Sequence, residues 1–288
     1  MRPRTLLSCF LLAALCAAED LPITRLAGMH YVVKDMERTR QFYAGVLGLE
    51  QAFDVPCEPD GSTCAYFKLN DDQYMVFSPG AVPAEGFRLH GVTKLTPDAA
   101  KLRAMLERRG LKPGPVSKGA DGGLHVMLAD PFGMQIDFVQ YAPGSRQATN
   151  RGKFLGPQRV TEQLFHAAVA VDGPDAGMAF YRDKLGFKES LRGGPNQEIR
   201  WINMDMPGTG INGDYIEQMV HTASPVFARQ HICFAAADMQ VAYTALAGKG
   251  LSGGFKPFLA TNNRWIINLK DPNGIRVEMM EPHEAKKQ

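Results

Sequence analysis

Hydrophobic and polar positions alternate in short runs along this chain and rarely continue over long helical stretches. A strand-like run begins at His30, and a polar turn and a helical pattern that ends at Gly48 follow it. The same succession of patterns begins again at His166 and ends at Gly186. Each helical stretch contains a Phe-Tyr pair, and the spacing between the two pairs is nearly the same as that between the two initial histidines. The chain therefore contains an internal repeat.

Two further pairs of segments extend this repeat. HGVTKLTPDAAKLRAMLERRG begins at His90, and its match HICFAAADMQVAYTALAGKG begins at His231. DPFGMQIDFVQ begins at Asp130, and DPNGIRVEMME follows it at the same spacing, from Asp271. Asp-Pro-Phe-Gly and Asp-Pro-Asn-Gly are typical of tight turns that precede a strand. We interpret the histidines that begin the matched segments as equivalent positions.

The repeat predicts two tandem modules, each built from two units with the order strand, helix and three short strands. One helix is expected in each of the four βαβββ units, over 36–47, 97–109, 175–185 and 239–249. The segment 142–161 is rich in Gly, Pro and polar residues, which is typical of a linker. We predict modules at 25–141 and 162–284, in an α+β fold with curved mixed sheets and outer helices.

The start of the chain, MRPRTLLSCFLLAALCAAED, has the three-part layout of a secretory signal peptide. Two arginines precede an apolar run, which small residues and then charged residues follow. We predict cleavage after Ala18, hence a signal peptide over 1–18 and a secreted or periplasmic protein. The apolar run is too short to cross a bilayer, and no later apolar stretch of about 18 residues exists. No membrane span is therefore expected after cleavage.

Three cysteines remain after this cleavage, and their pairing has two interpretations. In an oxidising compartment Cys57 and Cys64, which flank the turn-rich segment EPDGST, can form a disulfide. Two free thiols near a hairpin are an equally good interpretation. Cys233 is unpaired in both and is expected to fill apolar core.

Composition and charge narrow the classes of function. The 288 residues are 45% hydrophobic and 22% charged, which is typical of a globular protein. Removal of Arg2 and Arg4 leaves 30 of the 32 Lys and Arg residues against 30 Asp and Glu residues. A chain this close to neutrality lacks the basic charge that nucleic-acid binding requires. We expect a small-molecule substrate, no nucleic acid, and a monomer or homodimer.

Histidines and carboxylates of the repeated strands are candidate metal ligands. Four of the seven histidines begin repeated strands, and each module ends with a carboxylate in an apolar strand, Asp137 or Glu278. A buried carboxylate is costly unless it is paired or binds a cation. Glu217 lies in another strand-like run of the second module, where the first module has Met75 or Val76. Imidazole and carboxylate groups together suit a divalent ion such as Ni, Zn, Mn or Fe.

In these motifs the chain resembles the vicinal oxygen chelate superfamily, which includes glyoxalase I, methylmalonyl-CoA epimerase, extradiol dioxygenases and bleomycin-resistance proteins. The resemblance rests on the doubled module, the Phe-Tyr helices, the HICFAAAD strand and the DPNGIRVE ending, and it covers about residues 25–284. It implies four metal ligands on the concave face of an open barrel, namely His166, Glu217, His231 and Glu278. A candidate second site in the first module has three, namely His30, His90 and Asp137.

The resemblance leaves the pairing of the ligands open, because some relatives complete a site with units from different modules or chains. His166 and Glu217 pair either with the other two ligands of their own module or with His90 and Asp137 of the first module. The identity of the metal and of the substrate is equally open.

The resemblance implies a lyase or isomerase of the glyoxalase–epimerase type as the leading function. In that chemistry the metal stabilises an enediolate left by removal of a carbon-bound proton, with Glu278 or Glu217 as the base. An extradiol Fe(II) dioxygenase is one alternative. Against it, Asn268 lies near the place where such enzymes carry a tyrosine, and Glu217 reduces open coordination. A protein that binds a ligand without turnover is the other alternative, which the full ligand set disfavours.

Overall fold

The protein is described here by a computed structural model, which covers residues 19–57, 61–83, 87–208, 213–220, 230–251 and 255–285. The strands of the first half of the chain are β1 (Arg25–Val33), β2 (Glu50–Pro56), β3 (Thr63–Lys68), β4 (Tyr74–Pro79), β5 (Phe87–Leu95), β6 (Ser117–Lys118), β7 (Leu124–Ala129) and β8 (Gln135–Gln140). The strands of the second half are β9 (Leu164–Val171), β10 (Lys188–Gly193), β11 (Trp201–Asp205), β12 (Tyr215–Val220), β13 (His231–Ala235), β14 (Phe258–Leu259), β15 (Trp265–Lys270) and β16 (Arg276–Met280).

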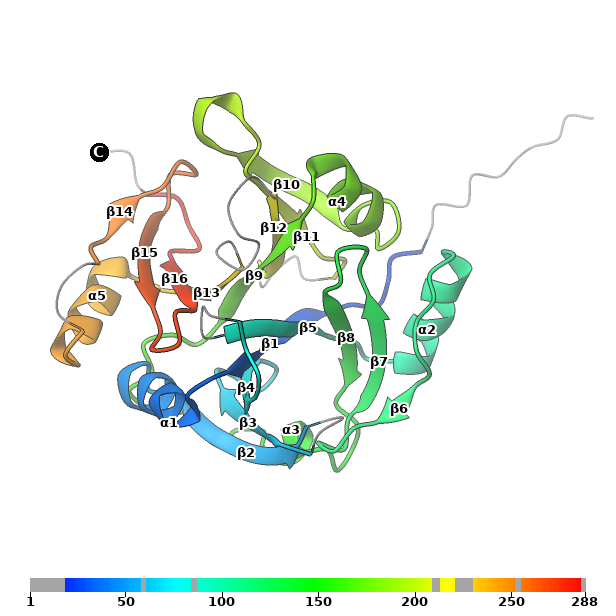
Figure 1. The fold of residues 1–288 in the computed structure, drawn as a ribbon, viewed down its shortest axis with the longest axis horizontal. Helices are drawn as coiled ribbons and strands as arrows, with labels where there is room; N and C mark the ends of the chain where they lie inside the picture. The colour runs from blue at the N-terminus through cyan, green and yellow to red at the C-terminus, as the bar shows by residue number, and fades with distance from the viewer. Residues whose placement is uncertain are drawn as a thin grey trace, which may run out of the picture.

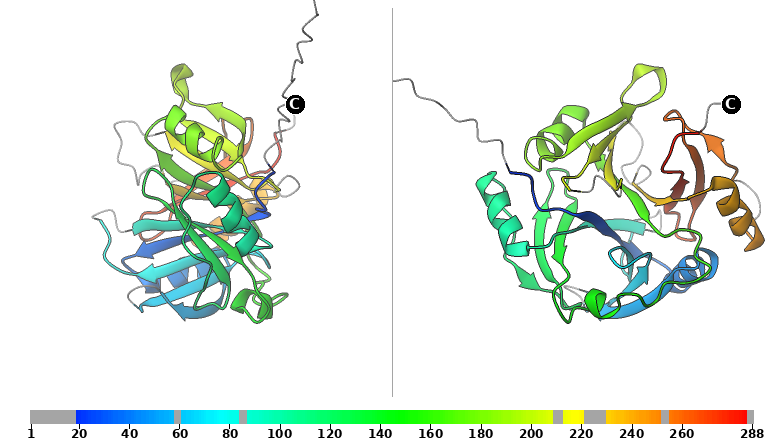
Figure 2. Two further views of the ribbon diagram at one scale, coloured as in Figure 1. Left: turned by 90° about the vertical axis from the view of Figure 1, so that its right-hand side faces the viewer. Right: turned by 180° about the vertical axis from the view of Figure 1, so that it is seen from behind.

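Each half of the chain forms its own curved eight-stranded sheet (Figure 1). The strand order is β2-β3-β4-β1-β5-β8-β7-β6 in the first sheet and β10-β11-β12-β9-β13-β16-β15-β14 in the second. The two orders are the same when corresponding strands are compared. Figure 2 shows the two sheets lying one above the other in side view. The predicted fold, an α+β arrangement of two tandem modules with mixed curved sheets, is confirmed.

The helices lie outside the sheets and occupy the predicted segments. They are α1 (Met36–Arg40), which continues as the π-helix η1 (Gln41–Val46), α2 (Ala99–Arg108), α4 (Pro174–Tyr181) and α5 (Met239–Gly248). Asp98 and Asp238 accept hydrogen bonds from the backbone amides of the first turns of α2 and α5, which fixes where these helices begin. Two short helices, α3 (Arg146–Thr149) and the 3-10 helix η2 (Pro195–Gln197), are the other helices of the described residues.

The segment between the two sheets packs closely against the first module. It contains α3, and Ser145 and Gln147 within it are buried. The ammonium of Lys68, on β3, donates hydrogen bonds to the backbone carbonyls of Asn150 and Lys153. Because a buried ammonium needs such acceptors, these bonds fix the segment to the sheet.

A buried polar cluster joins the modules where β1 lies beside β9. Asp214 accepts hydrogen bonds from the Arg25 guanidinium at 3.1 Å and from the Gln163 amide at 2.7 Å. Gln73, which holds the corresponding place in the first module, donates to the carbonyls of Leu26 and Leu164. The contact between the modules is therefore built on specific hydrogen bonds as well as on apolar burial.

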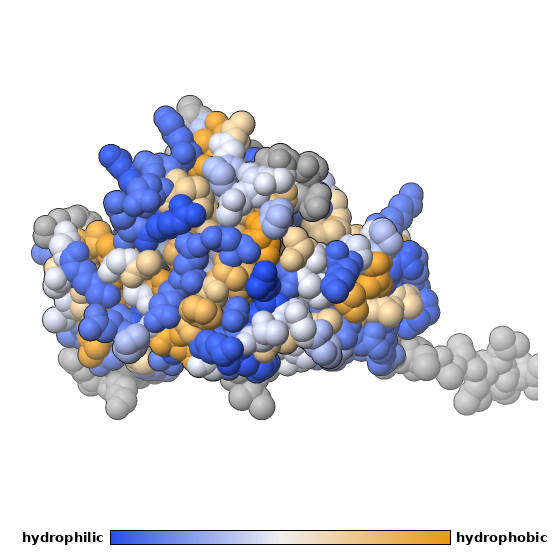
Figure 3. Space-filling model, turned by 90° about the horizontal axis from the view of Figure 1, so that it is seen from below, coloured by the Kyte–Doolittle hydropathy of each residue, from blue (hydrophilic) through white to orange (hydrophobic). Residues whose placement is uncertain are grey.

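The outer surface of the first module carries hydrophobic positions scattered among polar ones (Figure 3). Within the described residues, no helix has both the length and the apolar character needed to cross a membrane. The predicted signal peptide over 1–18 lies outside the described residues.

Candidate metal centre

The four predicted metal ligands of the second module lie on four adjacent strands of one sheet. In the order of the sheet these strands are β12, β9, β13 and β16, and they carry Glu217, His166, His231 and Glu278 respectively. The sheet therefore brings together ligands from the same module, as one of the two predicted pairings requires.

The side chains of this set converge on one another. His166 Nε2 lies 3.2 Å from His231 Nε2, and Glu217 Oε2 lies 3.3 Å from the latter nitrogen and 3.6 Å from the former. Glu278 Oε1 lies 3.9 Å from His166 Nε2. One ligand atom each from His166, Glu217 and His231 lies within 4.8 Å of the other two, which is the spacing of donors around a single ion.

Burial keeps the imidazole of His166 neutral. The side chain is completely buried, which lowers its pKa to about 3, although the negative charge of Glu217 acts in the opposite direction. A neutral imidazole has a lone pair to donate, and it is the form that binds metals. It is costly to bring two imidazoles and two carboxylates together out of water unless a cation binds them. The donor set therefore fits a divalent metal ion.

An arginine that the sequence analysis did not consider also stabilises Glu278. Arg276 Nη2 lies 2.6 Å from Glu278 Oε2, and Arg276 Nε donates a hydrogen bond to Asn268 Oδ1 at 2.7 Å. Residues two apart in a strand share a face, so the spacing of Arg276 and Glu278 in the sequence could have predicted this ion pair. Asn268 thus positions the arginine that partly balances the buried carboxylate.

Cys233 lies inside the same group of side chains. In the sheet register it is opposite His166 on β9 and opposite Glu278 on β16. Its sulfur, a nitrogen of His166 and an oxygen of Glu278 all lie within 4.8 Å of one another. The thiol is fully buried, and burial raises its pKa well above the usual range. It packs against Phe165 and Tyr215, so it fills core as expected and also borders the metal centre.

The sheet register shows that the histidines of the two modules are not equivalent. On β9, His166 is opposite Tyr215 of β12 and Cys233 of β13. In the first module the counterparts of Tyr215 and Cys233 are Tyr74 of β4 and Thr93 of β5. The residue of β1 that lies opposite both is Gly28. The interpretation of His30 as the counterpart of His166 is therefore wrong, and Gly28 is the counterpart.

The same correction applies to the second histidine. His231 is opposite Arg276 of β16. In the first module the counterpart of Arg276 is Gln135 of β8, and the residue opposite it is Gly91. His90 is thus displaced by one residue from the position of His231. The carboxylate was aligned correctly, because Asp137 is opposite Thr93 as Glu278 is opposite Cys233.

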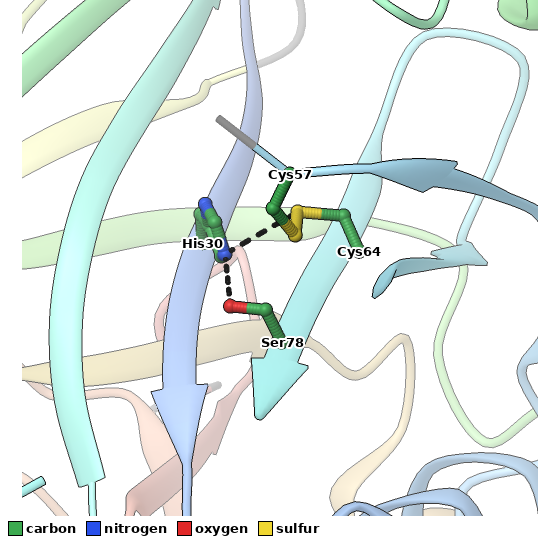
Figure 4. The surroundings of a disulfide bond; sticks show 4 residues. All are labelled: His30, Cys57, Cys64 and Ser78. Carbon is green, nitrogen blue, oxygen red and sulfur yellow. Dashed lines mark hydrogen bonds between the residues drawn. A yellow bond between two sulfur atoms is a disulfide. The ribbon is translucent and has the colours of Figure 1, made fainter. Parts of the chain in front are cut away.

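His30, His90 and Asp137 are distributed over two different clusters in the first module. The rings of His30 and His90 lie 4.7 Å apart, and His30 Nε2 is 2.9 Å from Ser78 Oγ (Figure 4). Asp137 instead lies 2.9 Å from His125 Nδ1. Among the described residues these three side chains do not form a group whose ligand atoms converge as in the second module.

Cys57 and Cys64 form a disulfide, which decides between the two interpretations of these cysteines. The bond lies beside His30, whose Nε2 is 3.8 Å from Cys64 Sγ (Figure 4). A disulfide cannot supply thiolate ligands, so the proximity of His30 to these sulfurs does not make a metal site.

Comparison with known proteins relates the chain to one superfamily. The model of the Glyoxalase/Bleomycin resistance protein/Dioxygenase superfamily matches residues 24–138 and 163–279. The search of curated proteins found no match.

Several solved structures share the fold. A variant of homoprotocatechuate 2,3-dioxygenase from B. fuscum has a TM-score of 0.69 and 18% identity, over 93% of this chain and 74% of that one. The 2,3-dioxygenase LapB from Pseudomonas sp. KL28 has a TM-score of 0.68 and 17% identity, over 94% of this chain and 96% of that one. At these identities the similarity shows the fold and leaves the reaction open.

Proposed function

This chain belongs to the Glyoxalase/Bleomycin resistance protein/Dioxygenase superfamily, and we propose that it is a divalent-metal-dependent enzyme that acts on a small substrate. The observation that carries the proposal is the convergence of His166, Glu217 and His231 in the buried second-module site. Glu278 completes the ligand set, and the metal is one of Ni, Zn, Mn and Fe.

We propose that the reaction is a proton transfer of the lyase or isomerase type. When bound, the metal supplies a Lewis acid for neighbouring oxygens of the substrate. His166 and His231 hold their lone pairs toward it from adjacent strands, and burial excludes water from them. A carboxylate then removes the carbon-bound proton of the substrate.

Glu217 is the better candidate for this base. Its side chain is 12% exposed, whereas that of Glu278 is 5% exposed. One oxygen of Glu278 already accepts a hydrogen bond from Arg276, so this oxygen is not free to meet the substrate. Glu217 is therefore the residue that we propose accepts the proton, through its other oxygen, because Oε2 faces the two histidines, and Glu278 serves as a ligand.

The metal content of the purified mature protein tests the proposal. We expect about one divalent ion per chain by elemental mass spectrometry, and its loss from a His231→Ala, Glu278→Ala double variant. His283→Ala is the matched control, because this exposed histidine lies outside the centre and should leave the metal in place. The absence of metal from the wild type, even after reconstitution with each ion, would contradict the proposal.

A ring-cleaving dioxygenase is the second candidate. The two-module fold favours this reaction, since both dioxygenases compared above align with most of this chain. Against it, Glu217 adds a carboxylate beside both histidines, and Asn268 is occupied with Arg276. Oxygen consumption with catechols by the iron-loaded protein separates the two reactions. Oxygen uptake that depends on His231 would favour the dioxygenase, and exchange of substrate C–H protons with solvent would favour the lyase or isomerase.

We also propose that the protein is exported, as the layout of its first residues indicates. The disulfide between Cys57 and Cys64 supports this, because disulfides persist in oxidising compartments. Expression of the full chain in its native host, followed by fractionation and N-terminal sequencing, is expected to give an extracytoplasmic protein that begins at Glu19. A cytoplasmic protein that retains Met1 would contradict export and would leave the metal centre unaffected.

A further inference from the structure

The first module contains a cavity of about 690 Å³, a volume typical of small-molecule sites. Side chains from β1, β3, β4, β5, β7 and β8 line it, and none of the four candidate metal ligands of the second module does. The cavity is thus separate from the metal centre and has no assigned role in the proposed reaction.

One wall of this cavity is aromatic. The rings of Tyr66 and Tyr74 lie 6.2 Å apart, and those of Tyr74 and Tyr141 lie 6.4 Å apart in an edge-to-face arrangement. All three tyrosines line the cavity, together with apolar side chains such as Val55 and Val139. Aromatic faces carry partial negative charge, so such a wall suits a planar apolar body or a cation.

A charged triad forms another part of the lining. His125 lies between two carboxylates, with Nδ1 2.9 Å from Asp137 and Nε2 3.0 Å from Asp121. Both ring nitrogens can donate to carboxylates only when the imidazole is protonated. Burial lowers the pKa of His125, but the two carboxylates outweigh it and raise the value to about 10. Two negative charges and one positive charge leave the triad with one net negative charge.

Asp137 is the carboxylate of this triad with the most acceptor capacity left. Asp121 already accepts three hydrogen bonds, from His125, from the Gly123 amide and from the side chain of Gln147. Asp137 accepts from His125 alone among the described side chains, and 17% of it remains exposed. Asp137 is therefore the carboxylate that a ligand in the cavity can reach.

The other ionisable groups of the lining do not cancel the negative charge. Lys118 is exposed on β6, where water screens its ammonium. At the disulfide end, burial lowers the pKa of His30 to about 3, with His90 and Arg88 adding to the effect, so this imidazole is neutral. The excess charge is therefore located at Asp137.

We propose that the first-module cavity binds a small organic ammonium compound with a planar apolar body. The ammonium group, which has three donors and no acceptor, pairs with the carboxylate of Asp137. The apolar body lies against the tyrosine wall. A carboxylate ligand is excluded, because it would bring a second negative charge beside Asp137 without a cation to pair with it.

A set of three probes of similar shape and different charge tests this proposal. Isothermal titration of the metal-loaded mature protein at pH 7 uses 2-phenylethylammonium, 2-phenylethanol and phenylacetate. We expect the ammonium to bind once per chain and at least about tenfold more tightly than the alcohol, with no binding of phenylacetate. Equal or tighter binding of phenylacetate, or binding of none of the three, would overturn the proposal.

Variants then locate the binding. Asp137→Asn is expected to weaken binding of the ammonium by about tenfold or more while affinity for the alcohol stays unchanged. Tyr66→Leu removes one ring of the aromatic wall, so a loss of a few-fold for both the ammonium and the alcohol is expected even if Asp137→Asn fails to fold. Glu217→Gln in the second module is the matched control and should leave the affinity unchanged. Unchanged affinity in Tyr66→Leu, or a loss in Glu217→Gln, would overturn the assignment.

Discussion

Two glycines mark the difference between the modules at the scale of single residues. Gly28 and Gly91 occupy the places that His166 and His231 occupy in the second module. A β-carbon added at Gly28 would lie 2.3 Å from the carbonyl oxygen of Tyr74, and one at Gly91 would lie 3.0 Å from that of Gln135. The backbone of the first module therefore has no room for a side chain at Gly28 and little room for one at Gly91.

We predict that Gly28→Ala destabilises the protein by about 1–3 kcal/mol, because the new methyl group would press on the backbone of β4. Urea unfolding at neutral pH measures the change. Gly45→Ala is the matched control, since a β-carbon there meets nothing within 4 Å. A loss at Gly28 no larger than at Gly45 would show that β1 and β4 can separate without cost.

A second prediction at this scale concerns the carboxyl group of Asp271. Burial raises its pKa to about 6, against the lowering effect of the hydrogen bonds it accepts from the backbone amides of Ile275 and Asn273. Since the folded protein holds this proton more tightly than the unfolded chain, the group contributes stability that is complete below about pH 4. That contribution is lost as the pH rises through about 6.

The wild type is therefore expected to lose on the order of 3 kcal/mol between pH 4 and pH 7.5 relative to Asp271→Asn, which does not titrate. Urea unfolding of both proteins at the two pH values measures the difference. Asp98→Asn provides the control, because Asp98 is an exposed helix cap and asparagine caps equally well. A difference between the wild type and Asp271→Asn that does not change with pH would refute the prediction.

At the scale of elements, the repeated motifs that revealed the two modules also hold them together. Tyr181 of the Phe-Tyr pair in α4 donates a hydrogen bond to Asp130 in the first module's Asp-Pro turn, at 2.9 Å. In the reciprocal contact, Asn273 in the second module's turn donates to Thr39 of α1 at 2.8 Å and accepts from the Asp35 amide. In Figure 1, α1 accordingly lies close to β15 and β16, and α4 close to β8.

We predict that Tyr181→Phe lowers the free energy of unfolding by about 1–2 kcal/mol, because it leaves one oxygen of the buried Asp130 without its hydroxyl donor. Thermal unfolding followed by circular dichroism measures the loss. Tyr243→Phe is a fair comparison, since Tyr243 is only partly buried and contacts Phe255 within its own module. Equal effects of the two substitutions would mean that the hydroxyl of Tyr181 contributes nothing across the interface.

The elements could be predicted from the sequence far better than their register. Helix caps and Asp-Pro turns are local signals, so α2, α5 and the last strand of each module were placed correctly. Register depends on bulges, and in the pairing of β1 with β5 one bulge leaves His90 without an opposite residue, between Leu89 and Gly91. Because local similarity does not show such shifts, His90 was matched one residue away, and His30 two residues away, from the true counterparts of His231 and His166. The spacing between the two Phe-Tyr pairs, applied to His166, would have led to Gly28.

The His125 triad illustrates a different limit of sequence reasoning. Its members are 4 and 12 residues apart in the chain, and a glycine-rich turn and two strands bring them together. No local pattern distinguishes His125 from an ordinary surface histidine. The candidate ligands of the second module were easier to find, because carboxylates stand out among apolar neighbours at Glu217 and Glu278.

At the scale of the whole molecule, the two modules carry different groups of polar side chains. The second module carries the converging imidazoles and carboxylates, and the first carries an aromatic cavity with a charged triad. Their hydrophobic interiors form one continuous cluster that includes residues of both sheets. Since the buried polar cluster around Asp214 crosses the same boundary, we expect the two modules to unfold together.

Calorimetry tests this coupling, and Asp214 is the residue to change. The wild type is expected to unfold in a single transition whose calorimetric and van't Hoff enthalpies agree. Asp214→Ala leaves Arg25 and the Gln163 amide without their buried acceptor, so a loss of about 3–5 kcal/mol is expected, with the transition broadening or dividing in two. Asp72→Ala is the control, because Asp72 also pairs with Arg25 but at 3.9 Å and with a partly exposed side chain. Two separate transitions in the wild type, or equal losses in the two variants, would mean that the modules are stable independently and that their polar contact is incidental.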